Sequence, residues 1–257
     1  TPRLDSSSAS DVYKSQLMGD TIDTISEIRR EIEGSLSGLL TDYVVVFFLH
    51  NPPDEPDVMN RAIDVFEELK NEGKIKSIGA SIKLANITPA TVSLCRQYID
   101  TGRVDVLEVA YSIIRQANAE NFAYAHEKGV GIIARTAIES GFLSGKYQPG
   151  DEFNEGHRDR WDKDTVQLIL KHASELQSYA IRDPYQSLAQ VALRFALAPK
   201  EVSCLIVGPE NPDEVRKNTE TMSLPPLDDD LIERFQKEFE GKTGLFNLNP
   251  QKQWDNT

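Results

Sequence analysis

Two kinds of segment alternate along the chain. Runs that are apolar nearly throughout lie at 43–50, 75–81, 104–112, 129–136 and 202–209. Such short runs predict buried β-strands. Between them, apolar residues recur with the i, i+3, i+4, i+7 spacing of a helix with one buried face, first at 22–39 and then at 58–69. Further helices are predicted at 88–100, 118–128, 163–180, 185–198, 212–221 and 228–239.

This alternation predicts repeated βα units around a parallel sheet. The strands lack the apolar–polar alternation of a half-exposed sheet, so both of their faces are expected to be covered. An open doubly wound sheet and a (β/α)8 barrel both fit the pattern. A dinucleotide-binding open sheet carries a G-x-G-x-x-G turn after its first strand, and this sequence has none. We therefore predict an α/β fold of the (β/α)8 TIM-barrel type, with residues 1–257 forming a single domain.

The carboxyl ends of the predicted strands carry polar side chains. In a (β/α)8 barrel the reactive groups lie at these ends. The strand "YVVVFFLH" ends in His50, and the next ones end in Ser81, Tyr111 and Arg135. A strand-end histidine alone is more often a structural residue bonded to a carbonyl, but its place on the barrel rim favours a functional role.

Composition narrows the class of protein. The net charge of −13 argues against a nucleic-acid partner, and no apolar tract is long enough to predict a membrane span. Cys95 and Cys204 lie far apart in apolar surroundings, so they are expected to be buried free thiols in a reducing, cytoplasmic compartment. With four scattered histidines, no metal site is predicted.

Two later segments have the composition of anion-binding loops. "SGFLSGKY" at 140–147 offers two glycines, hydroxyl groups and Lys146, which suit a pyrophosphate. "GPENPDEVRKN" predicts a turn into a helix that starts near Pro212, whose amino-terminal dipole suits an anionic group. The mixed-charge segment "NEGHRDRW" at 154–161, which contains His157, is more simply interpreted as a solvated loop, with a ligand clamp as the alternative.

Five segments, in order, resemble one family. "SLSGLLTDYVVVFFLHNPP", "ELKNEGKIKSIGASI", "VDVLEVAYSIIRQ", "GVGIIARTAIESGFLSGKY" and "SLAQVALRFALAPKEVSCLIVGPENPDEVRKN" are similar to strands four to eight of the aldo/keto reductases, with their helices. The resemblance implies NAD(P)H-dependent reduction of a small carbonyl compound (an aldehyde, a ketone or a sugar-like molecule). It gives no oligomeric state.

The resemblance also implies roles for residues. His50 corresponds to the active-site histidine that orients the substrate carbonyl. The residues that correspond to the binding site for NADP(H) or NAD(H) are Ser81, Glu108, Tyr111, Arg135, Thr136, Ile138, Gly141, Leu143, Gly145, Lys146, Gly208, Glu210, Glu214 and Asn218. From the residues alone, Tyr111 either supports the cofactor ring or fills the barrel top, and Arg135 needs Glu108 or Glu139 as an ion-pair partner.

The sequence departs from the family pattern at several positions. Ile82 replaces the usual asparagine after the fifth strand, Glu108 a glutamine, and Ser112 an asparagine. Glu210 stands where arginine or lysine is frequent, and Lys217 replaces a glutamate. A carboxylate at position 210 repels a 2′-phosphate but accepts a hydrogen bond from a ribose hydroxyl, which favours NADH. Lys217 or Arg216 could offset that repulsion, so NADPH stays open as the alternative.

The family's catalytic aspartate, tyrosine and lysine belong to its first three strands, ahead of the segment that ends in His50. We expect these strands to be missing from this sequence, as in the carboxyl-terminal three quarters of a longer protein. The alternatives are a cofactor-binding scaffold without catalysis, and a different barrel enzyme such as a phosphate-binding lyase or isomerase.

Overall fold

A curved parallel sheet forms the centre of the molecule. The computed structural model describes residues 22–82, 87–154, 156 and 158–242. Within them, five strands pair in sequence order. They are β1 (Val44–His50), β2 (Ile75–Ser81), β3 (Val106–Ala110), β4 (Gly131–Arg135) and β5 (Val202–Ile206). Every pairing is parallel, as predicted.

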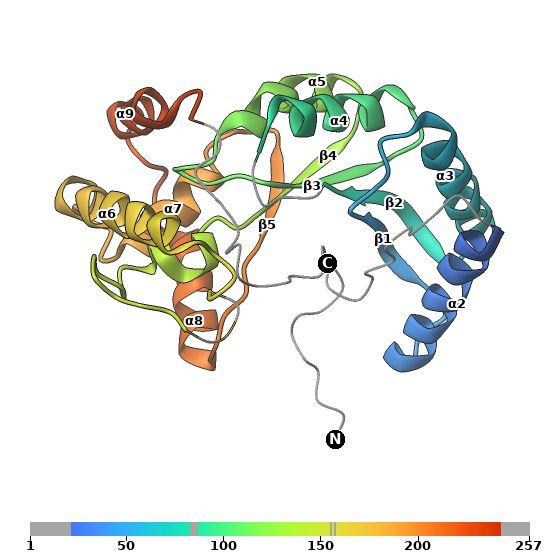
Figure 1. Ribbon diagram of the computed structural model, residues 1–257, viewed down its shortest axis with the longest axis horizontal. Helices are drawn as coiled ribbons and strands as arrows, with labels where there is room; N and C mark the ends of the chain where they lie inside the picture. Colours follow the sequence, from blue (N-terminus) through green and yellow to red (C-terminus); the bar gives the residue numbers. More distant parts are fainter. Residues whose placement is uncertain (1–21, 83–86, 155, 157, 243–257) are drawn as a thin grey trace.

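Helices cover the convex side of this sheet (Figure 1). The α-helices are α2 (Ile22–Leu39), α3 (Pro56–Asn71), α4 (Pro89–Asp100), α5 (Phe122–Glu127), α6 (Lys163–Ala180), α7 (Leu188–Ala196), α8 (Pro212–Glu220) and α9 (Asp229–Phe239). Short 3₁₀ segments are η1 (Ala117–Asn121), η2 (Glu139–Ser144) and η3 (Thr221–Ser223). None of the described helices is both long and apolar enough to cross a membrane.

Side-chain caps explain where several helices begin. The Thr88 hydroxyl accepts a hydrogen bond from the amide of Thr91, and Pro89 occupies the first turn of α4. Asp162 and Asn211 cap α6 and α8 in the same way. These caps satisfy amide groups that no turn of the helix can reach.

The core lies between the sheet and the helices. Phe47 of β1 stacks on Phe66 of α3 with ring centroids 5.1 Å apart, and Ile63, Phe66 and Leu69 of α3 are fully buried, as its stripe predicts. The buried face of α2 ends earlier than predicted, because Ile32 and Leu36 are buried but Leu39 is 45% exposed.

The two cysteines differ, which corrects one expectation. Cys95 is buried in α4, and burial raises the pKa of its thiol to about 12. Cys204 is exposed, because it lies on β5, which pairs with β4 alone among the described strands. An apolar run therefore does not guarantee burial at the edge of a sheet.

The described sheet is an arc with two edges. Among the described strands, β1 pairs only with β2, and β5 only with β4. Residues on the edge strand β1 are correspondingly accessible, and Val45 is 64% exposed. The arrangement of parallel strands with an outer layer of helices is that of a (β/α)8 barrel whose sheet is not closed in the described residues.

Candidate active site at the strand ends

Parallel pairing brings the predicted site residues to one edge of the sheet. His50 is in register with Ser81, and Ser81 with Glu108. Arg135 is in register with both Ala110 and Ile206. All five strands therefore end together, and His50 is half-buried at the end of β1.

Three of these residues form a polar network across β2, β3 and β4. The Ser81 hydroxyl donates to Glu108 Oε1 at 3.0 Å, and the same oxygen lies 3.4 Å from Arg135 Nε. Arg135 Nη2 also donates to the Ile82 carbonyl at 2.7 Å. Ser81 is 1% and Glu108 5% exposed. Of the two partners considered for Arg135, the structure therefore selects Glu108.

Glu139 instead belongs to a second, buried network. It is fully buried and forms a two-pronged ion pair with Arg115, whose Nε lies 2.9 Å from Glu139 Oε1. The Ser112 hydroxyl also donates to Glu139. Main-chain hydrogen bonds in both directions close a tight turn between Ser112 and Arg115. This network ties the turn after β3 to the loop after β4.

The loop after β4 has an unusual backbone. Thr136, Glu139 and Ser140 have φ of 60°, 48° and 55°, values that cost energy in residues with side chains. Gly141 and Gly145 also have positive φ, and a Cβ at Gly141 would lie 2.8 Å from Arg158 Nη2. The backbone conformation thus favours glycine at position 141, and a larger residue would also have to displace the end of the Arg158 side chain.

The other predicted residues of this loop are partly covered. Ile138 packs on the core and Leu143 is fully buried, so the side chain of Leu143 supports the loop from beneath. Thr136 Oγ1 donates to the Arg135 carbonyl at 2.6 Å. A ligand approaching here would meet the main chain and Lys146, which is exposed.

Two ion pairs join this region to the loop between β5 and α8. Lys146 pairs with Glu214, and Arg158 Nη2 lies 2.8 Å from Glu210 Oε1. Hydrogen bonds from these basic partners lower the pKa of both carboxyls, and Glu214 correspondingly raises the pKa of Lys146. The loops predicted to contact the pyrophosphate and the adenosine end of a dinucleotide are therefore adjacent.

The amino terminus of α8 is already satisfied by the chain itself. The helix begins at Pro212, as predicted, but the amide of Glu214 is bonded to Asn211 Oδ1 at 3.0 Å. The amide of Glu210 is bonded to Glu214 Oε2 at 2.8 Å. Gly208 is exposed just before this turn, and Asn218 is half-buried on α8. An anion here would compete with Glu214.

Tyr111 lies apart from the strand-end network. Its ring stacks on Phe195 at 5.5 Å and meets the edge of Phe122 at 5.0 Å. The residue is 2% exposed, and burial raises the pKa of its hydroxyl. This packing agrees with the reading in which Tyr111 fills the barrel top.

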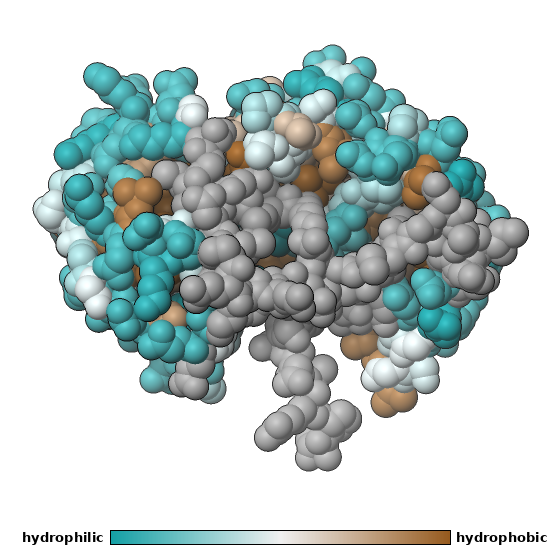
Figure 2. Space-filling view, viewed as in Figure 1, coloured by the Kyte–Doolittle hydropathy of each residue, from teal (hydrophilic) through white to brown (hydrophobic). Residues whose placement is uncertain are grey.

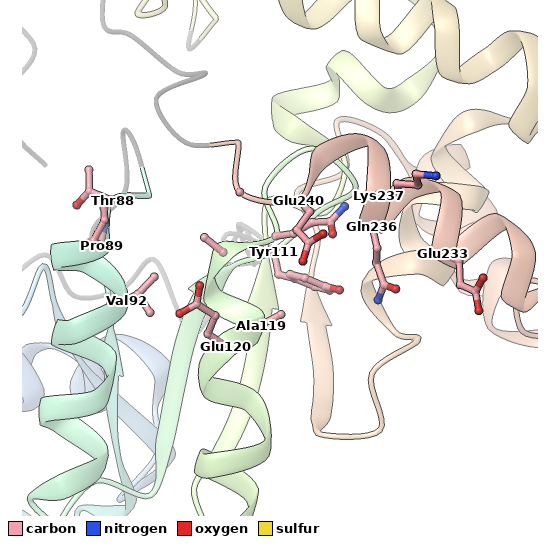
Figure 3. A pocket seen from close by; sticks show the side chains of 13 residues that line it. Thr88, Pro89, Val92, Tyr111, Ala119, Glu120, Glu233, Gln236, Lys237 and Glu240 are labelled. Atoms are coloured by element: carbon pink, nitrogen blue, oxygen red, sulfur yellow. The ribbon is translucent and has the colours of Figure 1, made fainter.

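Tyr111 also borders a cavity of about 930 Å³ between η1, the start of α4 and α9. Figure 3 shows Glu120, Glu233 and Glu240 around it, with Lys237 as the basic residue among the labelled side chains. Tyr111 is the one predicted site residue in its lining. A wall with this excess of carboxylates repels phosphate, so the cavity does not suit a dinucleotide.

The structure brings together one group of possible metal ligands that the sequence did not predict. His172 and Glu175 of α6 and Glu238 of α9 place one ligand atom each within 4.8 Å of one another. His172 Nδ1 lies 3.5 Å from Glu175 Oε2. The Tyr179 hydroxyl also donates to Glu238 at 2.7 Å. The group is hidden in the sequence because Glu238 lies on another helix. His157 lies outside the described residues.

Comparison with known proteins gives a consistent result. The family model "Aldo/keto reductase family" matches residues 18–238. The NADH-specific methylglyoxal reductase of Escherichia coli is 26% identical over 79% of this chain, and L-galactose dehydrogenase of Arabidopsis thaliana is 25% identical over 74%. The chain spans 61% and 56% of the lengths of these two relatives.

Solved structures show the same relationship. The holo form of aldo-keto reductase AKR11C1 from Bacillus halodurans superposes with a TM-score of 0.65 at 26% identity, covering 83% of this chain and 64% of that one. Glycerol dehydrogenase AKR11B4 from Gluconobacter oxydans gives 0.66 at 19% identity, covering 90% and 68%, and shares the fold.

Proposed function

Because this chain belongs to the aldo/keto reductase family, we propose that it contributes to the NAD(P)H-dependent reduction of a small carbonyl compound to an alcohol. The observation that carries the proposal is the Ser81–Glu108–Arg135 network beside His50, at the edge where all described strands end. A packed barrel floor would not need these buried polar groups.

The residues present fit a dinucleotide laid across the strand ends. Ser81 and Glu108 would bond the carboxamide of the nicotinamide. Lys146 and main-chain amides of 138–145 would hold the pyrophosphate. The amides of Glu139, Gly141 and Leu143 are excepted, because they donate to carbonyls of the loop itself. The loop at Gly208–Glu210 would take the adenosine end. When bound, the cofactor supplies the hydride.

His50 would act on the substrate. Negative charge develops on the carbonyl oxygen during reduction, and a donor fixed at the strand end stabilises that charge. His50 is half-buried, so part of the residue remains accessible. We assign the proton transfer to none of the described residues.

We further propose that NADH is preferred. Glu210 and Glu214 both lie at the loop that would hold the adenosine ribose, and both stay ionised because their basic partners lower their pKa. Two carboxylates repel a 2′-phosphate, whereas either accepts a hydrogen bond from a 2′-hydroxyl. The NADH-specific relative supports this choice.

The first test measures binding and turnover separately. NADH and NADPH binding is followed by fluorescence, and cofactor oxidation is then measured with methylglyoxal and glyceraldehyde. His50→Gln should lower kcat by about 10²–10³-fold while leaving the Kd for NADH unchanged. His126→Gln, on α5, is the matched control and should change neither quantity.

Two outcomes would contradict the proposal. Failure to bind either cofactor would exclude an oxidoreductase role for this chain. Saturable NADH binding without oxidation by any carbonyl would replace the enzyme with a cofactor-binding scaffold.

A further inference from the structure

Three arginines surround the loop after β4, and two of them have carboxylate partners. Arg115 pairs with Glu139, and Arg158 with Glu210. In the described part of the chain, no carboxylate oxygen lies within 4.0 Å of a nitrogen of Arg160, and Arg160 Nε is buried without a hydrogen bond. Arg160 is therefore the arginine of this cluster that carries an unmatched charge.

A shortage of acids does not explain this arrangement. The chain has 41 acidic and 28 basic residues, so a carboxylate is the commonest charged neighbour that a surface arginine could find. Arg160 is half-buried, with its guanidinium carbon 4.9 Å from the centre of the Trp161 ring. Burial, followed by the charge of Arg115, lowers its pKa. A guanidinium stays charged in proteins, so it is held here at a cost that a bound anion would offset.

The position of the segment places this charge beside the proposed site. Arg158 Nε donates to the Ser140 carbonyl at 2.8 Å, and the amide of Trp161 donates to the Arg158 carbonyl at 3.2 Å. The segment 158–161 is thus packed on the loop after β4, whose Glu139 is tied to the turn after β3. Both loops leave the sheet at the edge where His50 and Ser81 lie.

We propose that Arg160 binds the oxyanion group, a carboxylate or a phosphate, of a ligand at the strand ends. The planar guanidinium presents two parallel N–H groups that match the two oxygens of such a group. The inference rests on the proposed function insofar as the ligand is its substrate or cofactor. It narrows the substrate class to carbonyl compounds with an acidic group, unless the oxyanion belongs to the cofactor.

The binding test needs no turnover, so it remains informative if the proposed activity fails. Trp161 adjoins Arg160, and the chain has one other tryptophan, Trp254. The Trp254→Phe variant is titrated with benzoate and with inorganic pyrophosphate, and the fluorescence of Trp161 is followed. Benzamide serves as the neutral analogue. At least one anion should bind saturably and more tightly than benzamide.

Variants assign that binding to Arg160. Arg160→Met should raise the Kd for the anion by about ten- to a hundredfold, the loss expected for a hydrogen-bonded charge pair. Arg160→Lys should raise this Kd less. Arg182→Met removes an arginine that pairs with Asp228 and Asp230 and should leave the titration unchanged. Circular dichroism verifies that each variant is folded. If Arg160→Met does not fold, Arg160→Lys still tests the proposal.

Turnover then identifies the source of the oxyanion. If it belongs to the substrate, Arg160→Met should raise KM for 4-carboxybenzaldehyde but not for its methyl ester. If it belongs to the cofactor, the variant should raise KM for NADH with both aldehydes alike. The proposal is overturned if Arg160→Met leaves the Kd for the anions unchanged, or if the variant weakens the binding of benzamide as much as the binding of the anions.

Discussion

At the scale of single residues, Glu210 and Glu214 give the clearest link between charge and ligand choice. They are separated by one turn of chain, and each is held by a basic residue from a distant segment, Arg158 and Lys146. Neither contact can be predicted from sequence spacing, because 52 and 68 residues separate the partners. The identity of Glu210, by contrast, is visible in the sequence and already indicates which cofactor it would repel.

Replacement of Glu210 tests whether this carboxylate repels the 2′-phosphate of NADPH. Glu210→Gln keeps the size of the side chain but removes its charge, so KM for NADPH should fall by about tenfold while KM for NADH changes little. Because the hydrogen bond from Arg158 lowers the pKa of Glu210, the carboxyl is ionised at neutral pH, where the 2′-phosphate of NADPH also carries most of its charge and the repulsion acts. The measurement is the ratio of kcat/KM for the two cofactors at low salt.

The matched control is Glu220→Gln, an exposed glutamate at the other end of α8. It should leave the ratio unchanged. Equal ratios for the native chain and Glu210→Gln would show that Glu210 does not contact the ribose region.

At the scale of elements, the buried Arg115–Glu139 pair holds two loops in place. The pair is 5% and 0% exposed, and Glu139 carries positive φ in a strained segment. Removing one partner leaves the other charge buried without compensation. Glu139→Gln should therefore lower the free energy of unfolding by about 3–5 kcal/mol.

Urea unfolding measures this loss and separates it from an ordinary surface effect. The double variant Arg115→Met/Glu139→Leu removes both charges and should be less destabilised than Glu139→Gln. Glu67→Gln breaks a partly exposed pair with Arg103 and should cost less than Glu139→Gln, about 1 kcal/mol. If Glu139→Gln costs no more than Glu67→Gln, the buried pair does not hold the loops.

The elements themselves could largely be predicted from sequence, and the exceptions have physical reasons. The strand at 75–81 and the helix at 163–180 have the predicted bounds, since apolar periodicity and capping residues determine both. The strand predicted at 104–112 ends at Ala110, because the apolar run continues into a buried turn. Ile113 and Ile114 are fully buried there without belonging to a strand.

The residues of the candidate site could be predicted only in part, because some of them are brought together by contacts in space. Strand ends locate His50, Ser81 and Arg135 in the sequence, because parallel strands end at one edge. The role proposed for Arg160 has no such signal, since its distinguishing feature is the lack of a carboxylate partner among the described residues. Tyr111 shows the opposite case, in which a residue at a strand end packs between Phe122 and Phe195.

At the scale of the whole molecule, the sheet presents an edge with apolar side chains. Among the described strands β1 has β2 as its one neighbour, and Val45 is 64% exposed. Leu40 and Tyr43, just before the strand, are 86% and 47% exposed. Figure 2 shows apolar atoms at the lower edge of the molecule, over the region where Figure 1 draws the end of α2. An edge strand that has one partner among the described strands is a template for pairing with another strand.

We therefore expect the chain to self-associate through β1. Val45→Lys places a charge on the outer side of the edge strand, where lysine is the residue that natural sheets use to prevent pairing. Sedimentation velocity over a concentration series should show association of the unchanged chain and a shift of Val45→Lys towards monomer. Val215→Lys removes a comparably exposed valine, 47% accessible on α8, and should leave the association unchanged. If both variants reduce association equally, general surface hydrophobicity causes it. If neither does, the edge of β1 is protected in solution, and the apolar residues beside it contact some other part of the protein.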